Sequence, residues 1–392
     1  MSSQSTVFQL SGTCNNYDWG KKGRESLAGR LCENTPTGFK IKDDEPYSEM
    51  WFGDYPDFPA RVLESRELLS DVLQKNKEKL LGKKILSIAK ALPLQIHPNK
   101  SLATKLHEQD PDNFTDPNHK PEIAVALGKF EVFAGFKPLD NISPIFNIPA
   151  LRDFIPDDTK TWTDETLREV TRRLLLADEA TVEKASKAIA DTPREELGSN
   201  AYVLQLLPRL QEQYGKGDPG TLVALLCMNF LVLEAGEALY IPADGIHAYL
   251  SGDIVECMAR SNNVLNTGFC PPGDRNNIDL FSKTLTFKAH SKKDVMLPEE
   301  KSSRSVEGRT VVYRPPLSEF DMLRTELDEK NRAETIKAGE GPSVAIVTGG
   351  EGLLEADERQ FEVKAGHIYF IAPGVEAKWG TTEKMQIFTT VV

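Results

Sequence analysis

The stretch GEALYIPADGIHAYL, Gly236–Leu250, decides how the chain is organised. It begins with a glycine, continues as a short apolar segment, turns after Ile-Pro, and reaches a single histidine, His247. This order predicts a strand along one wall of a small β-barrel and a turn that places an imidazole at the barrel mouth. Since imidazole is a common metal ligand, we expect His247 to belong to a metal site.

Two earlier segments supply candidate partners: PLQIHPNK at 93–100 and NHKPE at 118–122. Gln95 and His97 are two residues apart on an expected strand, so their side chains share one face. Glu122 follows a proline. Two imidazoles and a carboxylate form an ordinary zinc set with a position left open for water or substrate, and a Gln95 oxygen would be a weaker fourth ligand. Spacing alone leaves a purely structural role for these side chains open.

Composition limits the classes of protein that the chain fits. Its 392 residues are 40% hydrophobic and 27% charged, which is ordinary for a globular protein of two or three domains. The net charge of −12 argues against nucleic acid or an anionic membrane as the main partner. Five cysteines without a CxxC pair, no signal-peptide pattern and no long apolar run predict a reducing, cytoplasmic location.

Hydrophobic periodicity predicts the order of the elements. The expected elements are a helix over Glu64–Gly82, a strand over Ile85–His97, a helix over 101–113 with Ser101 as its N-cap, strands at Ile123–Leu127 and Phe130–Phe136, and a helix over Asp164–Leu176. Residues 344–380 then repeat the strand and turn pattern of the opening stretch. Val375–Lys378 stands where the first copy has its histidine, and His367 lies in the preceding turn, so we expect no metal in this second unit.

These patterns predict a mainly β fold with an α-helical insertion. We expect one β-barrel from residues 1–140 and 226–290, a helical insertion at 141–225, and a second barrel at 291–392 that opens with a charged linker, Ser291–Glu307.

Several motifs resemble those of one family in order along the chain: NYDWG, PYSEMW, QIHPNK, DPNHKPE, GEALYIP and HAYLSGDIVECMA. They are similar to the type I phosphomannose isomerases, zinc enzymes that interconvert mannose 6-phosphate and fructose 6-phosphate. The resemblance implies two cupin barrels of jelly-roll type with a helical insertion. It also implies one zinc ion per chain, held by Gln95, His97, Glu122 and His247. The implied reaction is a proton transfer through a cis-enediol, which would supply GDP-mannose synthesis.

The same resemblance implies roles for residues around the metal. Lys120 and Glu256 would be catalytic, although Glu256 could equally be an inward carboxylate with a structural role. The implied substrate-binding residues are Trp19, Lys100, Tyr249 and Arg260. Trp19 could instead pack beneath a loop. The expected partner is a small sugar phosphate, and the expected state is a monomer or weak oligomer.

The chain departs from the family pattern beyond the last ligand. The family's aspartate, arginine and lysine are Asn262, Asn266 and Pro272 here, and its serine before the metal-binding glutamine is Pro93. Lost charge weakens a phosphate site by about 1.5–3 kcal/mol for each charge-assisted bond. Arg260, Arg275 and Lys100 are the cations that could compensate. Two alternatives therefore stay open: an isomerase with an altered sugar substrate, and a non-catalytic zinc cupin that binds a sugar phosphate as a regulator.

Overall fold

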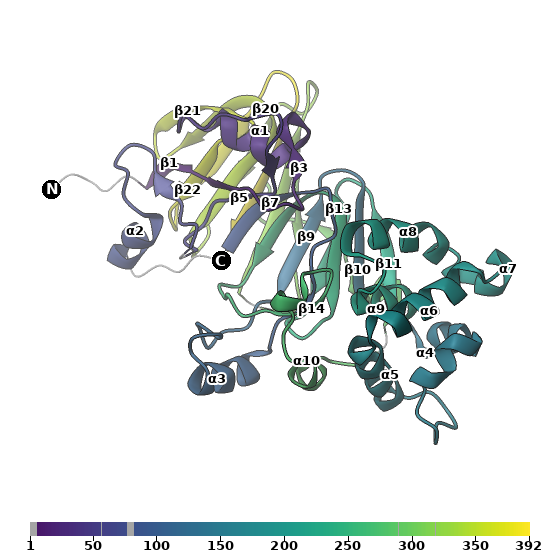
Figure 1. Ribbon diagram of the computed structural model, residues 1–392. Helices are drawn as coiled ribbons and strands as arrows, with labels where there is room; N and C mark the ends of the chain where they lie inside the picture. Colours follow the sequence, from purple (N-terminus) through teal and green to yellow (C-terminus); the bar gives the residue numbers. More distant parts are fainter. Residues whose placement is uncertain (1–5, 56, 77–81, 289, 318) are drawn as a thin grey trace.

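The computed structural model describes residues 6–55, 57–76, 82–288, 290–317 and 319–392. Within these residues, two antiparallel sheets of eleven strands each lie side by side, and a group of helices packs against one of them (Figure 1). The predicted fold class, mainly β with a helical insertion, is confirmed. No helix in this part of the chain is long and apolar enough to cross a membrane.

The first sheet, called sheet I here, carries all the predicted metal ligands. Its main path is β15 (Met296–Leu297), β12 (Ala238–Ile241), β9 (Glu122–Ala126), β13 (His247–Met258), β7 (Gly82–Ile88), β5 (Glu49–Trp51) and β2 (Thr13–Asn15). Four further strands pair beside this path: β8 (Leu94–Ile96), β10 (Phe130–Phe136), β11 (Met228–Leu233) and β14 (Leu265–Gly268).

The long strand β13 joins the two halves of sheet I. Its first residues pair with β8 and β10, and its last residues pair with β7 and β9. The change of partners falls at Gly252, which has φ +123 and where an added Cβ would lie 2.6 Å from the Lys129 carbonyl oxygen. Glycine is required because a side chain would strain the backbone and collide with this oxygen. One strand can therefore carry both His247 and Glu256 into the same barrel.

The second sheet, sheet II, is built mainly from the C-terminal third. Its strands are β16 (Glu299–Lys301), β17 (Thr310–Tyr313), β18 (Asp321–Leu327), β24 (Met385–Val391), β20 (Ser343–Ala356), β22 (Ile368–Ile371), β1 (Val7–Ser11), β6 (Arg61–Val62), β19 (Ala333–Ile336), β21 (Arg359–Lys364) and β23 (Ala377–Gly380). The N-terminal strand β1 pairs with β22, and in Figure 1 its purple ribbon lies among the green-yellow strands. In the opposite direction, β15 pairs with β12 of sheet I. The predicted domain boundaries stay a prediction. An N-terminal strand, β1, belongs to sheet II, and a strand from the C-terminal region, β15, belongs to sheet I.

The remaining short elements lie near the sheets. They are β3 (Lys21–Lys22), β4 (Pro46–Tyr47), α1 (Leu27–Asn34), α2 (Leu69–Asn76), α3 (Lys100–Gln109), α10 (Ile278–Thr284) and α11 (Lys292–Val295).

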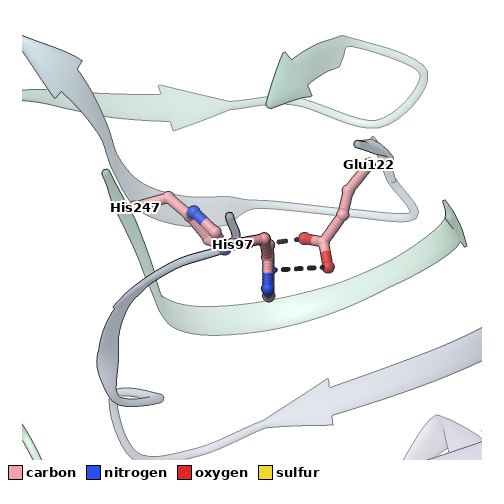
Figure 2. Close-up of side chains that lie close together, drawn as sticks. All are labelled: His97, Glu122 and His247. Atoms are coloured by element: carbon pink, nitrogen blue, oxygen red, sulfur yellow. Dashed lines mark ion pairs between the residues drawn. The ribbon is translucent and has the colours of Figure 1, made fainter. Parts of the chain in front are cut away.

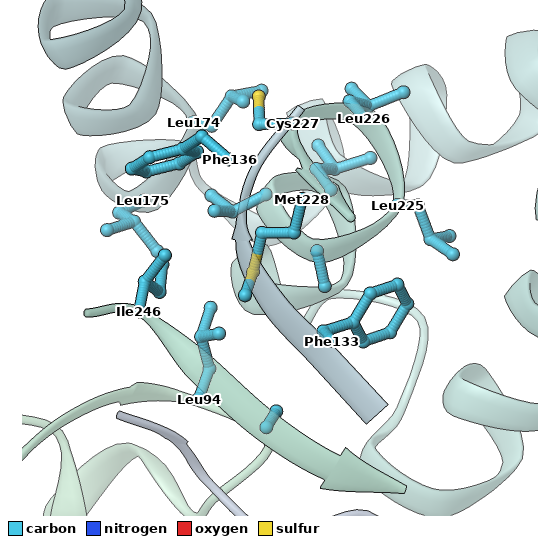
Figure 3. Close-up of a cluster of buried hydrophobic side chains, with 14 of the residues drawn as sticks. Leu94, Phe133, Phe136, Leu174, Leu175, Leu225, Leu226, Cys227, Met228 and Ile246 are labelled. Carbon is cyan, nitrogen blue, oxygen red and sulfur yellow. The ribbon is translucent and has the colours of Figure 1, made fainter. Parts of the chain in front are cut away.

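Helices of the insertion cover one side of sheet I. They are α4 (Leu139–Ile142), α5 (Asp164–Leu176), α6 (Glu179–Ala190), α7 (Arg194–Leu197), α8 (Val203–Tyr214) and α9 (Pro219–Cys227). Every residue of α9 is buried, so this helix is the centre of the layer. Figure 3 shows Leu225 and Leu226 of α9 in one apolar cluster with Leu94 and Phe133 of the sheet. Burial of such side chains contributes about 1.5–3 kcal/mol each, so the insertion is firmly attached to the barrel.

The two sheets share a core as well. One cluster of buried residues contains Ile85 and Val255 of sheet I and Val344 and Phe388 of sheet II. The Lys83 ammonium, also buried here, donates to the Val344 carbonyl oxygen across the junction. The barrels are therefore joined by a dry interface.

Local expectations met different outcomes. The helix Asp164–Leu176 and the strand Phe130–Phe136 are confirmed. The strand over Ile85–His97 is wrong as one element: β7 ends at Ile88 and β8 begins at Leu94, because the intervening Ala89 and Lys90 amides bond to the Trp19 carbonyl.

Helix ends were less accurate. The helix expected over 101–113 is α3, and its N-cap is Asn99, whose side chain accepts from the Leu102 amide at 3.1 Å, instead of Ser101. The helix expected over Glu64–Gly82 is only Leu69–Asn76, and residues 77–81 lie outside the described part. The linker expected at Ser291–Glu307 contains α11, β15 and β16, because Met296–Leu297 pairs with β12 and Glu299–Lys301 pairs with β17.

Candidate metal centre

Three of the four predicted metal ligands meet inside sheet I (Figure 2). His97 follows β8, Glu122 begins β9 and His247 begins β13, and all three are buried. The His97 Nε2 atom lies 3.3 Å from one Glu122 oxygen, and the His247 Nε2 atom lies 3.5 Å from the other. One ligand atom from each residue lies within 4.8 Å of the others.

The outer nitrogens of both imidazoles fix their tautomers. The Nδ1 of His97 lies 2.7 Å from the Asn263 carbonyl oxygen, and the Nδ1 of His247 lies 2.9 Å from that of Gly245. A carbonyl only accepts, so each Nδ1 carries the proton and each Nε2 keeps its lone pair. Burial lowers the pKa of His97 and lowers that of His247 to about 4, so both rings are neutral near pH 7.

These lone pairs converge on a carboxylate, which fits a bound cation. Burial opposes ionisation of Glu122, but nearby positive charge, including that of Lys120, holds its pKa well below its ordinary value. Neither Nε2 atom has a hydrogen-bond partner among the described residues. Two lone pairs that face an anion repel it unless a positive ion lies between them. Neutral imidazoles held by carbonyls and a carboxylate are a donor set typical of zinc.

The fourth predicted ligand, Gln95, lies in β8, which runs between β13 and β14. Its Cα pairs with that of His247 on one side and that of Asn266 on the other. Directly paired residues of antiparallel strands project to the same face of a sheet. Gln95 is therefore placed beside the centre, and its role as a ligand stays a prediction.

The predicted catalytic residues lie close to the triad. The Lys120 Nζ atom is 3.6 Å from Glu122. The Tyr249 hydroxyl donates to the other Glu122 oxygen at 3.2 Å, and the charges of Glu122 and Glu256 add to burial in raising the pKa of Tyr249. Two carboxylates, a lysine and a tyrosine thus surround one side of the centre.

Glu256 is part of a buried charge network that sequence reasoning missed. The Lys84 ammonium lies 2.9 Å from Glu256 and 3.0 Å from Glu49, and Glu49 also accepts from the Trp51 indole at 2.8 Å. Burial opposes the charge of Lys84, but both carboxylates raise its pKa above the ordinary value. Burial and then the charge of Glu122 raise the pKa of Glu256 to about 7. The two lysines that open the mainly apolar run KKILSIA, and the glutamate of PYSEMW, were the available signals.

The predicted substrate contacts are not all gathered at the centre. Trp19 lines a cavity of about 640 Å³ together with Pro93, Pro272 and Arg275. Lys100 is exposed at the start of α3. The Arg260 side chain is 48% exposed and lies 3.5 Å from Asp54. Tyr249 thus contacts the triad through Glu122, Trp19 lines the cavity, and Lys100 and Arg260 are not placed with the triad; the substrate-binding roles stay predictions.

The departures from the family pattern have distinct surroundings. Asn262 donates to Asp57 at 3.0 Å. Asn266 in β14 pairs with Gln95 in β8. Its side-chain oxygen is buried without a partner among the described residues. Arg275 lies 2.8 Å from the buried Asp218 and lines the same cavity as Pro272. Arg275 is therefore the one of the three compensating cations named above that lies in this cavity.

Fold and site together define a class, the metal-binding cupins, here with two β-barrels and a helical insertion. A family model for the catalytic domain of type I phosphomannose isomerase matches residues 7–139. Mannose-6-phosphate isomerases of Candida glabrata and Saccharomyces cerevisiae are 34% and 33% identical and cover 96% and 94% of this chain and of their own lengths. The chain belongs to the type I phosphomannose isomerase family.

Solved structures agree on the fold. A mannose 6-phosphate isomerase bound with zinc and yttrium has a TM-score of 0.81 at 23% identity and covers 98% of this chain and 99% of its own. The Salmonella typhimurium enzyme bound to fructose 6-phosphate and zinc gives the same TM-score, identity and coverage. The likeness extends over both barrels and the helical insertion.

Proposed function

We propose that the protein is a zinc-dependent aldose–ketose isomerase that interconverts mannose 6-phosphate and fructose 6-phosphate. The observation that carries the proposal is the pair of Nε2 lone pairs directed at the Glu122 carboxylate among three buried side chains. Family membership supports the choice of substrate, because the relatives are named mannose-6-phosphate isomerases. In a cell, the reaction would supply mannose 6-phosphate for GDP-mannose synthesis.

His97, Glu122 and His247 would hold the zinc ion, with Gln95 as a fourth ligand. Zinc bound there would supply a Lewis acid that stabilises negative charge on the sugar oxygens. The tautomers of both histidines are already set by their carbonyl partners, so the ligands need no rearrangement before the metal binds.

Glu256 is the residue that we propose as the proton carrier between C1 and C2. Isomerisation removes the proton from C2 of the aldose and returns one to C1, while a proton also moves from the C2 hydroxyl to the C1 oxygen. A base for this chemistry works best when its pKa lies near the working pH. The pKa of Glu256, about 7, meets this requirement because burial and the charge of Glu122 raise it, and Lys84, which also pairs with Glu49, opposes only part of that rise.

Lys120 and Tyr249 would act on the sugar oxygens. Lys120 presents a positive charge beside Glu122, which suits an oxygen that becomes negative in the enediol. The Tyr249 hydroxyl already donates to Glu122 and so holds that carboxylate in place. Both roles are proposals supported by position.

The phosphate end of the substrate would lie in the cavity of Trp19 and Arg275. Pro93 lines this cavity and lies two residues before Gln95 in the sequence, which supports the proposal that the phosphate end binds there. The variant Arg275→Gln keeps a donor for Asp218 and removes the charge. We expect its KM for mannose 6-phosphate to rise about tenfold or more, in line with about 1.5–3 kcal/mol for a charge-assisted bond, with zinc content unchanged.

The test is a coupled assay of the zinc-loaded protein with mannose 6-phosphate and fructose 6-phosphate. Turnover that is lost on chelation and restored by zinc supports the proposal. Stoichiometric zinc without turnover would refute it and favour a sugar-binding regulator. Faster turnover of unphosphorylated mannose would favour the altered substrate, which the missing charges at Asn266 and Pro272 make the second candidate. The cytoplasmic location and the monomeric or weakly oligomeric state stay predictions.

A further inference from the structure

Asn263 bonds both to the ligand His97 and to the segment that leads to the ligand Glu122. No described hydrogen bond joins it to Glu122 itself. It lies between β13 and β14 and is 1% exposed. Its backbone carbonyl accepts from the His97 Nδ1 at 2.7 Å. The bond fixes the tautomer of that ligand, so the position of this carbonyl sets the direction in which the His97 lone pair points.

The side chain of the same residue holds the segment that leads to Glu122. Its Nδ2 donates to the Asp116 carbonyl at 2.7 Å and to the Asn118 carbonyl at 3.0 Å. Four residues beyond Asn118 the chain reaches Glu122 and enters β9. Lys120 lies within this segment. The donors of one amide group therefore fix the path of the loop that carries both a ligand and a proposed catalytic residue.

Further hydrogen bonds make the connection stiff. The Asn263 amide donates to the Ser261 hydroxyl at 3.1 Å, and this hydroxyl donates to the Asn118 carbonyl at 3.1 Å. The Asn262 amide donates to the Asp116 carboxylate at 2.8 Å. The Ser261 and Asn262 bonds tie 261–263 to 116–118, and the Asn263–Ser261 bond holds the first segment together, so a shift of one segment alone would break these bonds.

We propose that Asn263 is a positioning residue that sets the distance between His97 and Glu122 and so tunes zinc affinity. The inference rests on the proposed zinc site. Loss of an outer partner of a metal ligand typically weakens metal affinity about 10–100-fold. The Asn263→Ala variant keeps the backbone carbonyl but frees the 116–118 segment, and we expect zinc affinity to fall by about that factor.

The chain offers a matched control in Asn229. It is also buried, at 2% exposed, and its Nδ2 donates to two carbonyls, those of Phe136 and His290, both at 3.0 Å. Asn229→Ala removes the same chemistry from two carbonyls that accept from none of the described metal ligands. We expect both variants to lose a similar unfolding free energy, about 1–3 kcal/mol, while only Asn263→Ala loses zinc affinity.

The experiment measures zinc affinity by competition with a chromophoric chelator and the visible spectrum of the Co²⁺-loaded protein. We expect a weaker affinity and a changed spectrum for Asn263→Ala and unchanged values for Asn229→Ala. If Asn263→Ala does not fold, Asn263→Ser, which fills more of the space and has one donor in place of two, takes its place with the same expectation in direction. Wild-type affinity and spectrum in a destabilised Asn263 variant would overturn the inference. A wild-type protein that binds no zinc would overturn the proposed function instead.

Discussion

Replacement of Lys84 by methionine tests the buried charge network most directly. Lys84 lies 3.0 Å from Glu49 and 2.9 Å from Glu256, and its side chain is 10% exposed. Methionine keeps most of the volume and removes the charge, so two carboxylates remain buried without their cation. Removal of one partner from a buried ion pair costs about 3–5 kcal/mol. We expect Lys84→Met to lose about this much unfolding free energy at pH 8.

The pH dependence has a definite sign. In the wild-type protein, burial works against ionisation of Glu49, but Lys84 and the Trp51 indole hold its pKa below the ordinary value. In Lys84→Met both carboxylates lose that support, and their pKa values rise above those of the unfolded chain. The folded variant then binds more protons than the unfolded chain, so it regains up to about 1.4 kcal/mol per pH unit and per carboxylate as the pH falls through these values.

The assay is urea unfolding of wild type and Lys84→Met at pH 8 and pH 5, followed by circular dichroism. The deficit of Lys84→Met should be clearly smaller at pH 5. Leu86→Ala offers the control for lost packing, because Leu86 is buried in the same strand β7 and carries no titratable group, so its deficit should be the same at both pH values. An equal deficit of Lys84→Met at both pH values would show that lost packing, and no charge network, explains the effect.

Three further outcomes follow from the same contacts. Glu256→Gln should keep its zinc and lower kcat about 10²–10⁴-fold in the coupled assay, whereas an unchanged kcat would exclude Glu256 as the proton carrier. His247→Ala should lose zinc on dialysis, and full zinc occupancy by elemental analysis would show that the ligand set is wrong. Burial lowers the pKa of Lys83 from 10.5 to about 7, so the unfolded chain binds this proton more tightly and wild-type stability rises with pH across that window. Lys83→Met should therefore be more stable than wild type at pH 6 by at least about 1.4 kcal/mol. This difference in unfolding free energy should shrink toward pH 10. A difference that stays the same at every pH in urea unfolding would contradict this reasoning.

The sequence predicted the metal ligands better than the buried charge network beside them. His97, Glu122 and His247 were recognisable because their motifs are local and each lies at the boundary of a strand, His97 just after β8 and the other two at the starts of β9 and β13. Lys84 and Glu49 were missed because their meeting depends on the pairing of β5 with β7, which no spacing within either segment reveals. Register between strands is decided by the whole sheet, and it settles which polar side chains face inward.

The fold class was predictable where a local pattern marks an element, and less so where strand pairing decides it. Asp164–Leu176 follows a clear helical period and has a capping box at Thr163, so its limits could be predicted. Residues of the expected linker carry no such period, yet Met296–Leu297 extends sheet I because β12 offers an open edge. Lys100 was expected near the substrate from its motif, but the Asn99 cap begins α3 there and leaves Lys100 exposed. Tertiary pairing decided these cases.

The pairing of β1 with β22 has a consequence for the order of folding. Val7 lies opposite Ile371, so the first strand meets its partner only after nearly the entire chain has been synthesised. Contacts between residues so distant in sequence form slowly, because a long loop must close first. Sheet II therefore has to be completed after translation, and during synthesis the unpaired edge of β1 would be exposed to other chains. A fragment limited to residues 7–139 would keep that edge open permanently, and we expect it to aggregate.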